Sequence, residues 1–257
     1  MTFAVQVGNL ARRSIVRTSR QPAAVIAPLV FPMMLLAVNA GGLRATTHLK
    51  GFPTHSFVAF ALAVPFIQGA LFATMNAGTD LARDIQTGFL NRLALTPLRG
   101  SALISGHLAG VVVLGFLQSV FYLVVGVAIG VDIHSGVGGA FVLLLLATVI
   151  AAGFGAIGAW LALWAGSGET VQGMFPLLFV AFFMSSMNSP RNLISIDWFR
   201  WIATANPISY LIEGVRSLII TGWDWEALGL AFGTALVICV LAVAIAARAL
   251  TERLTRT

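Results

Sequence analysis

Residues 139–164 read GAFVLLLLATVIAAGFGAIGAWLALW, without a single Lys, Arg, Asp or Glu. A helix needs about 20 predominantly apolar residues to cross the hydrocarbon core of a bilayer. Within the stretch, Leu143–Leu146 is apolar on every side of a helix, so lipid or protein can cover any face. The strand of a membrane β-barrel would be about half as long and would alternate polar with apolar residues. The stretch therefore predicts a membrane-spanning helix.

The composition of the whole chain agrees with this prediction. Of its 257 residues, 58% are hydrophobic and 9% are charged, and the mean hydropathy is +0.94. A soluble domain carries about 25% charged residues, and a disordered chain carries few apolar ones. The single cysteine, Cys239, excludes an intramolecular disulfide framework. The chain is therefore expected to be an all-helical (all-α) integral membrane protein.

Five other stretches have the same character. Each lacks Lys, Arg, Asp and Glu and is bounded by charges, by Gly and Pro clusters or by a short polar loop. Together the stretches predict one transmembrane domain over residues 1–257. The six predicted spans are 22–40, 57–79, 108–130, 139–164, 171–187 and 227–247.

The basic residues indicate how these spans are oriented. The net charge of +6 arises from residues placed mostly between the spans, which favours a role in membrane orientation over binding of nucleic acid. With six spans, ten Lys and Arg residues fall on the side that holds both termini, and five fall on the other. Cytoplasmic connections carry the excess of Lys and Arg. Both termini are therefore expected in the cytoplasm.

The N-terminal residues 1–21 have a helical pattern of their own. Apolar residues recur at helical spacing from Phe3 to Leu10, and Arg13, Arg17 and Arg20 form a neighbouring stripe. This pattern predicts an amphipathic helix that lies at the interface against anionic lipid. The alternative is a basic flank that only sets orientation.

Residues 80–101 form the longest connection on the predicted cytoplasmic side. Apolar residues recur at four-residue steps from Leu81 to Leu93, and Pro97 ends the pattern. This spacing predicts an amphipathic helix with an exposed apolar stripe. The stripe can pack on a partner protein or on the end of its own bundle, and composition leaves both open.

Residues 188–226 are the longest connection on the other side. Their most apolar part, 208–220, has 13 residues and carries Glu213 and Arg216, so it is too short and too charged to span. We expect a pair of short external or re-entrant helices before the last span. Glu213 and Arg216 stand three residues apart and are expected to pair on one helical face.

Two segments carry family motifs. Residues 83–97 read RDIQTGFLNRLALTP and resemble the cytoplasmic loop of ABC-2 type transporter permeases, which has an acidic residue followed by Gly, an apolar pair and Pro. Residues 206–210 read NPISY and, with Glu213 and Arg216 downstream, are similar to the C-terminal signature of that family. Asn91 departs from the pattern, because relatives often carry an acidic residue there.

The resemblance implies the transmembrane half of an exporter in the plasma (inner) membrane of a bacterium. A cytoplasmic ATPase, in two copies, would dock on the loop between spans two and three, and a second permease, identical or paralogous, would complete the pathway. The implied coupling residues are Arg83, Asp84, Thr87, Gly88, Phe89, Leu90, Arg92, Leu93 and Pro97. The implied signature residues are Asn206, Pro207, Tyr210, Glu213 and Arg216.

The chain lacks the residues that an ATPase needs. No G-x-x-x-x-G-K-[ST] motif occurs and Lys50 is the only lysine, so ATP and Mg²⁺ are expected on the partner subunit. Residues 153–158, GFGAIG, fit a dinucleotide-binding pattern but lie inside a predicted span. The small residues Ala151, Gly155 and Ala159 recur every four residues and instead predict a close helix contact. We expect no catalytic residue and no metal site.

Two other classes of membrane protein are consistent with several spans, an intramembrane serine protease and a secondary transporter. An intramembrane serine protease would use Ser167, but no His lies in a later span to act as its base. An ATP-independent secondary transporter remains open, although no acidic residue sits in the middle of a span to relay protons.

Polar residues within the spans are the candidates for a transport pathway, because unpaired polarity is costly in lipid. They are Gln68, Asn76, Gln118, Tyr122 and Gln172. An alternative role is that they only bond neighbouring helices. The expected cargo is a hydrophobic or amphipathic drug or lipid-linked compound. The alternative cargo is a polysaccharide or lipid-linked glycan, whose exporters line their channels with aromatic residues.

Overall fold

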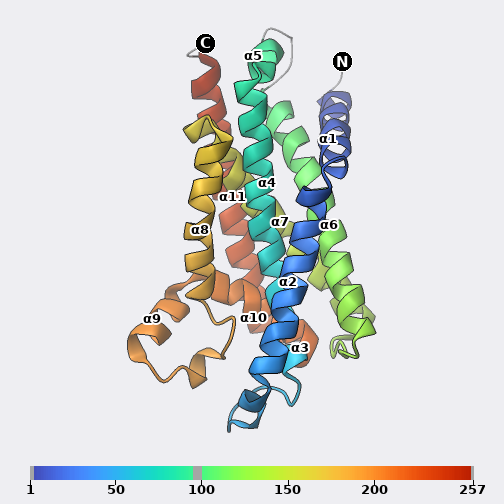
Figure 1. Ribbon diagram of the computed structural model, residues 1–257, viewed down its shortest axis with the longest axis vertical. Coiled ribbons are helices and arrows are strands. Elements are labelled where there is room, and N and C mark those ends of the chain that lie inside the picture. The colour runs from blue at the N-terminus through green and yellow to red at the C-terminus, as the bar shows by residue number, and fades with distance from the viewer. Residues whose placement is uncertain (1–2, 95–99, 256–257) are drawn as a thin grey trace.

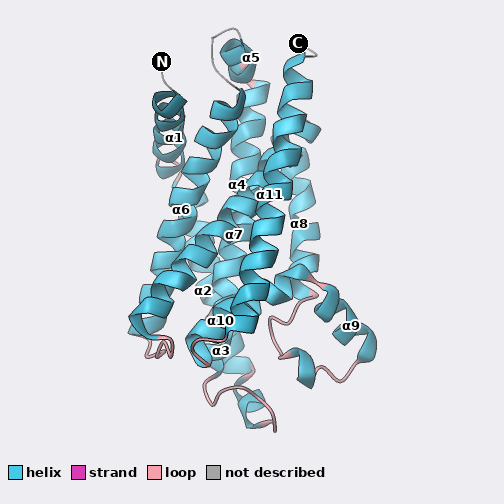
Figure 2. Ribbon diagram, turned by 180° about the vertical axis from the view of Figure 1, so that it is seen from behind, coloured by secondary structure: helices cyan, strands magenta, loops and turns pink. Residues whose placement is uncertain are grey.

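The structure is a computed structural model that describes residues 3–94 and 100–255, and these residues contain helices and loops but no strand (Figures 1 and 2). Two short 3-10 helices are η1 (Arg44–His48) and η2 (Arg191–Leu193). The α-helices are α1 (Phe3–Ser19), α2 (Pro22–Gly42), α3 (Phe57–Ala61), α4 (Ala63–Gln86), α5 (Phe89–Ala94), α6 (Gly100–Ala128), α7 (Gly136–Ala165), α8 (Gly168–Phe183), α9 (Asp197–Ala205), α10 (Pro207–Ile220) and α11 (Trp225–Thr255).

Five helical stretches in the described part of the chain are long and apolar enough to cross a membrane. They are Ala24–Gly42, Phe57–Gln86, Ala102–Ala128, Gly136–Ala165 and Trp225–Arg253. The remaining predicted span, 171–187, corresponds to α8, which has 16 residues and ends at Phe183. At 1.5 Å per residue, α8 reaches about 24 Å, less than the hydrocarbon core of about 30 Å. A sixth crossing therefore stays a prediction.

Helix α7 packs closely against three other helices. At each contact, the missing side chain of a glycine leaves room for the neighbouring helix. A methyl group on Gly153 would come within 3.2 Å of the Cys239 backbone on α11. One on Gly155 would press on Val111 of α6, and one on Gly158 would overlap the Thr74 carbonyl of α4. The predicted close contact is confirmed, and the GFGAIG segment is a packing motif.

The short turn between α7 and α8 shows how capping sets helix ends. Gly166 takes the left-handed conformation, with φ of 70°, and ends α7. The next residue, Ser167, accepts a hydrogen bond on its Oγ from the Thr170 N–H and begins α8. Ser167 thus caps a helix, and its hydroxyl is engaged as a cap rather than poised as a nucleophile.

The two ends of the bundle hold different segments. In Figure 1, both termini and α5 lie at one end, while α3 and α9 lie toward the other. Figure 2 shows the same division from behind. The arrangement agrees with placing the N-terminus, residues 80–101 and the C-terminus on one side. That this side is the cytoplasm stays a prediction.

The prediction of a single amphipathic helix over 80–101 is wrong. Helix α4 runs on to Gln86, and Gly88, with φ of 69°, turns the chain before α5 begins at Phe89. The stripe is partly covered, because Leu81 is buried and Ile85 packs against the same core cluster of the bundle. Residue Pro97 and the side chain of Leu93 lie outside the described part of the chain.

Residues 188–226 contain η2 and two short helices, α9 and α10. Helix α10 contacts α4, α7 and α11, and almost all of its side chains are buried. It therefore enters the bundle rather than lying on its surface.

We expect Gly158→Ala to destabilise the protein by about 1–3 kcal/mol, because the new methyl group meets backbone that has no room to shift. The melting temperature of the purified protein in detergent should fall. Gly229→Ala on α11 is the matched control, since nothing lies within 4 Å of the added methyl group. Equal melting temperatures for the two variants would contradict the tight α4–α7 contact.

Candidate functional site

Two arginines of α1 and two aspartates of α4 form a network, named here the arginine–aspartate cluster. Arg13 donates two hydrogen bonds to the Asp84 carboxylate, at 2.9 and 2.7 Å. Arg17 donates to Asp84 at 2.8 Å and to Asp80 at 2.8 Å. Bidentate arginine–carboxylate pairs are strong and fix geometry. The cluster therefore binds α1 to the end of α4.

The same cluster reaches α5. The guanidinium group of Arg13 lies 3.8 Å from the centre of the Phe89 ring, a cation–π contact. Hydrogen bonding to Asp84 raises the pKa of Arg13 above its ordinary value. One arginine of α1 thus contacts both α4 and α5.

The orientation of α1 differs from the prediction of a helix lying on anionic lipid. Two members of the predicted stripe, Arg13 and Arg17, point at carboxylates of α4, while Arg20 is exposed. Helix α1 also packs on α6, where Leu10 and Ser14 fill the space left by Gly106 and Gly110. Arg13 and Arg17 of the predicted stripe therefore contact another helix of the same protein.

The predicted coupling residues separate into buried and exposed ones. Asp84 and Leu90 are buried, so their contacts are internal. Arg83, Thr87 and Arg92 are exposed at the same end of the bundle. The exposed residues are the ones available to a partner protein.

A polar hollow of about 280 Å³ adjoins the cluster on the side of α2 and α8. Asp80 belongs to both features. The lining residues are Gln21, Thr79, Asp80, Arg83, Gln86, Gly168, Glu169 and Gln172.

Farther along α2, α4 and α8, the side chains at which these helices meet are aromatic. Rings of α2, α4 and α8 contact one another, with centroids 4.9 Å apart for Phe175 and Phe179 and 5.5 Å for Phe72 and Phe175. We call this group the aromatic cluster; it comprises Phe31, Phe72, Phe175, Phe179, Phe182 and Phe183. Phe31 and Phe183 are exposed at its edge. The face thus changes from polar to aromatic along its length.

Two of the predicted pathway residues stabilise the proline-containing helix α2. A helical proline leaves the carbonyl four residues earlier without its donor, so Pro28 frees the Ala24 carbonyl and Pro32 frees that of Pro28. The Asn76 side chain donates to the Ala24 carbonyl at 3.0 Å, and the Tyr122 hydroxyl donates to the Pro28 carbonyl. Both residues therefore bond a neighbouring helix.

Two further predicted pathway residues, Gln68 and Gln118, are buried glutamines. Gln68 is fully buried on α4, and neither of its amide atoms has a hydrogen-bond partner in the described part of the protein. Gln118 is also buried, and its Oε1 lacks a partner there as well. None of these four residues belongs to the aromatic cluster or the polar hollow, whereas Gln172, the fifth predicted residue, lines the polar hollow.

At the opposite end, Arg216 binds three backbone carbonyls, so its predicted pairing with Glu213 is wrong. Its guanidinium group donates to Phe60 at 3.1 Å, Ser186 at 3.2 Å and Met187 at 3.0 Å. These carbonyls lie near the C-terminal ends of α3 and α8, where the helix dipole favours a cation. Glu213 instead pairs with Arg191.

The Asn-Pro opening of α10 also has a structural role. Asn206 accepts a hydrogen bond from the Ile208 N–H and donates to the carbonyls of Ala181 and Met184 near the end of α8. Pro207 occupies the first turn, where no donor is needed. The Tyr210 hydroxyl donates to the Thr204 carbonyl of α9 at 2.9 Å. These residues hold α8, α9 and α10 together.

A model of the family described as ABC-2 type transporter matches residues 5–220. The chain belongs to the ABC-2 type transporter family. The match includes the arginine–aspartate cluster, the aromatic cluster and the signature segment, and it stops before α11. In ABC transporters built from such permeases, the ATPase is a separate subunit.

Named relatives of this ABC-2 chain are transport permeases. "Daunorubicin resistance ABC transporter permease protein DrrB1" of Streptomyces coeruleorubidus is 28% identical over 244 residues, covering 90% of this chain and 78% of the relative. "Probable doxorubicin resistance ABC transporter permease protein DrrC" of Mycobacterium tuberculosis is 26% identical, covering 86% and 79%. "Putative transport permease ycf38" of Porphyra purpurea is 24% identical, covering 86% and 76%.

The sequence contains a signal for the arginine–aspartate cluster. Arg13 and Arg17 stand four residues apart, as do Asp80 and Asp84, so each pair occupies one face of its helix. Two such faces of opposite charge at the same end of an ABC-2 permease predict contact. The aromatic cluster had no comparable signal, because phenylalanines are spread over several spans.

We expect Asp84→Asn to weaken the packing of α1, because it leaves Arg13 and Arg17 without their shared carboxylate. The loss should be about 1–3 kcal/mol, since the pairs are only partly buried. Hydrogen exchange of the α1 amides should become faster. Arg12→Gln, at an exposed position of the same helix, is the control. Unchanged exchange in Asp84→Asn would mean that the cluster does not hold α1.

Proposed function

We propose that this chain is the transmembrane subunit of an ATP-driven exporter that moves a hydrophobic or amphipathic compound, a drug or a lipid-linked molecule, out across the bacterial plasma membrane. A separate cytoplasmic ATPase, in two copies, binds ATP and Mg²⁺, and a second permease completes the pathway. Membership of the ABC-2 family is the observation that carries the ATPase coupling. The names of the relatives from Streptomyces coeruleorubidus and Mycobacterium tuberculosis support a drug as cargo.

The docking surface is the exposed part of residues 80–94. Arg83, Thr87 and Arg92 are exposed there and are available to the ATPase. Behind them, Phe89 stacks on Arg13, and Arg13 holds Asp84. A movement imposed on α5 therefore reaches α4 and α1 through strong polar contacts. This route needs only that the ATPase contact the surface differently in its two nucleotide states.

The cargo passes along the face made by α2, α4 and α8. The polar hollow at the coupling end admits the polar part of an amphipathic molecule, and the aromatic cluster beyond it accommodates the apolar part. The exposed edges at Phe31 and Phe183 leave this face free for a second permease. The change from polar to aromatic lining supports a cargo with both characters.

We expect Arg92→Glu to reduce co-purification of the ATPase severalfold, because it reverses a charge on the docking surface. Arg200→Glu is the matched control, since Arg200 is an exposed arginine on α9 at the other end of the bundle. Phe89→Asp should act like Arg92→Glu. Failure of the wild-type permease to retain any ATPase, together with transport in proteoliposomes that lack nucleotide, would favour an ATP-independent transporter.

We expect Phe179→Ala to lower ATP-dependent uptake of daunorubicin into inverted membrane vesicles severalfold, because the Phe179 ring contacts all five other rings of the aromatic cluster. Phe141→Ala is the control, since Phe141 is 69% exposed on α7 outside the cluster. Equal uptake by both variants would contradict the pathway. Absence of uptake by the wild type would favour the glycan alternative.

A further inference from the structure

A hollow of about 570 Å³ lies between α7 and α11, at the end of the bundle that holds both termini. Two aromatic side chains of α7, Trp160 and Trp164, form one wall. Charged side chains of α11 form the other wall, and they are Arg248, Glu252 and Arg253. The hollow therefore combines aromatic rings with charges of mainly positive sign.

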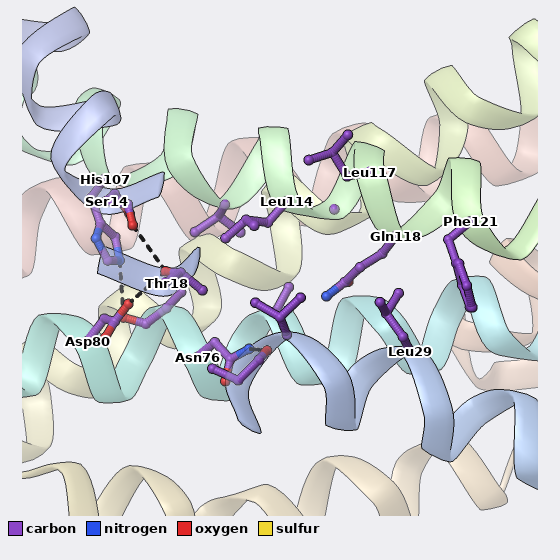
Figure 3. A pocket seen from close by; sticks show the side chains of 16 residues that line it. Ser14, Thr18, Leu29, Asn76, Asp80, His107, Leu114, Leu117, Gln118 and Phe121 are labelled. Carbon is purple, nitrogen blue, oxygen red and sulfur yellow. Dashed lines mark hydrogen bonds between the residues drawn. The ribbon is translucent and has the colours of Figure 1, made fainter. Parts of the chain in front are cut away.

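The hollow is separate from the sites described above. No residue of α2, α4 or α8, which form the face proposed for the cargo, lines it. Helix α2 lies in front in Figure 1 and α11 lies in front in Figure 2, so these helices are on opposite sides of the bundle. The cavity in Figure 3, where Thr18 and His107 lie at one end and Phe121 at the other, is a different one, because neither α7 nor α11 lines it.

The hollow lies at the level expected for a membrane surface. Both of its helices contain a stretch long and apolar enough to cross a membrane, Gly136–Ala165 in α7 and Trp225–Arg253 in α11. Trp164 stands at the end of the first stretch, and Arg248 stands near the end of the second. Tryptophan is enriched at membrane–water interfaces. Because Trp164 is 66% exposed, its ring faces the surroundings of the bundle.

An exposed apolar stripe of α11 leads from the middle of the span to the hollow. Val237, Leu241 and Ile245 are 58%, 57% and 45% exposed. They follow one another at four-residue steps, and Arg248 comes three residues after Ile245, so all four share one helical face. Acyl chains that follow this stripe would place the headgroup of their lipid beside Arg248.

Arg248 supplies an uncommitted positive charge at the end of the stripe. It is exposed, and it makes no ion pair or hydrogen bond among residues 3–94 and 100–255. Arg253 differs, because it donates to the Leu163 carbonyl at 2.8 Å and so joins α11 to the end of α7. Guanidinium groups match the geometry of phosphate oxygens and can bind two of them at once. Arg248 is therefore the residue available to a phosphate.

The size and the charge of the hollow fit a lipid headgroup. Sites for small molecules measure about 300–1,000 Å³, and this volume lies within that range. The walls carry two arginines and one glutamate, so their net charge is positive and favours an anion. Basic pockets between membrane helices are a recurring form of site for anionic headgroups.

We propose that this hollow binds the headgroup of an anionic phospholipid. The phosphate pairs with Arg248, the Trp164 ring packs beside the glycerol backbone, and the acyl chains follow Ile245 and Leu241 into the hydrocarbon layer. Arg253 remains on the Leu163 carbonyl and fixes the wall. Binding requires neither the ATPase nor a second permease, so the test of this site is independent of the proposed function.

The test uses the full-length protein in phosphatidylcholine nanodiscs that contain a small fraction of brominated lipid, either phosphatidylglycerol or phosphatidylcholine. Bromine on the acyl chains close to the ester quenches nearby tryptophans, and the difference from Trp164→Phe isolates the Trp164 signal. We expect phosphatidylglycerol to quench Trp164 severalfold more than phosphatidylcholine at equal content. Arg248→Gln should lower this preference about fivefold, the effect of one basic residue at an anionic surface, and Arg248→Lys should keep most of it.

Arg12→Gln is the matched control, because Arg12 is an exposed arginine at the same end that does not line the hollow. An equal loss in Arg12→Gln would overturn the site, since the preference would then follow the charge of the whole end. Equal quenching of the wild type by both lipids would overturn recognition of the anionic headgroup. Displacement of the brominated lipid by soluble glycerol phosphate would overturn the lipid as occupant. Protection of Trp164 from both lipids would mean that a protein covers this face and would also overturn the proposal.

Discussion

Hydrocarbon offers no hydrogen bonds, so a membrane helix that frees a backbone carbonyl or carries a charge needs a partner from its own protein. This constraint explains the most specific contacts of the chain. Pro28 and Pro32 free two carbonyls of α2, and Asn76 and Tyr122 supply the donors. Arg216 is buried and meets three carbonyls at helix ends. Asn76, Tyr122 and Arg216 are thus placed where backbone carbonyls require a donor.

Polar contacts hold each end of the bundle together, and these contacts differ between the two ends. At one end, charges of opposite sign join α1, α4 and α5, and these contacts pair strong donors with strong acceptors. At the other end, Arg216 and Asn206 hold the segment that follows α8 by donating hydrogen bonds to its backbone carbonyls. Between the ends, the glycines of α7 allow close packing, and the Thr74 hydroxyl of α4 donates to the Phe154 carbonyl of α7 at 2.9 Å. Side-chain contacts of different kinds thus fix the two ends of the bundle.

Much of the helical framework was predictable from residues 139–164 and similar stretches, because length and hydropathy decide which segments cross a bilayer. The partners of individual polar residues were not. Glu213 and Arg216 stand three residues apart, yet each bonds a segment distant in the chain. Arg13 and Asp84 are 71 residues apart, and only the packing of α1 brings them together. The break at Gly88 was not predictable from the apolar spacing, because that spacing continues across it.

We propose that the arginine–aspartate cluster carries movement from the proposed docking surface to the spans. The most direct test is the amount of daunorubicin transported per ATP hydrolysed, in proteoliposomes that contain the permease and its ATPase. The account predicts that Asp84→Asn retains the ATPase but loses most of the transport per ATP. Glu226→Gln, an exposed carboxylate at the other end of the bundle, should transport like the wild type. Wild-type transport per ATP in Asp84→Asn would contradict the account.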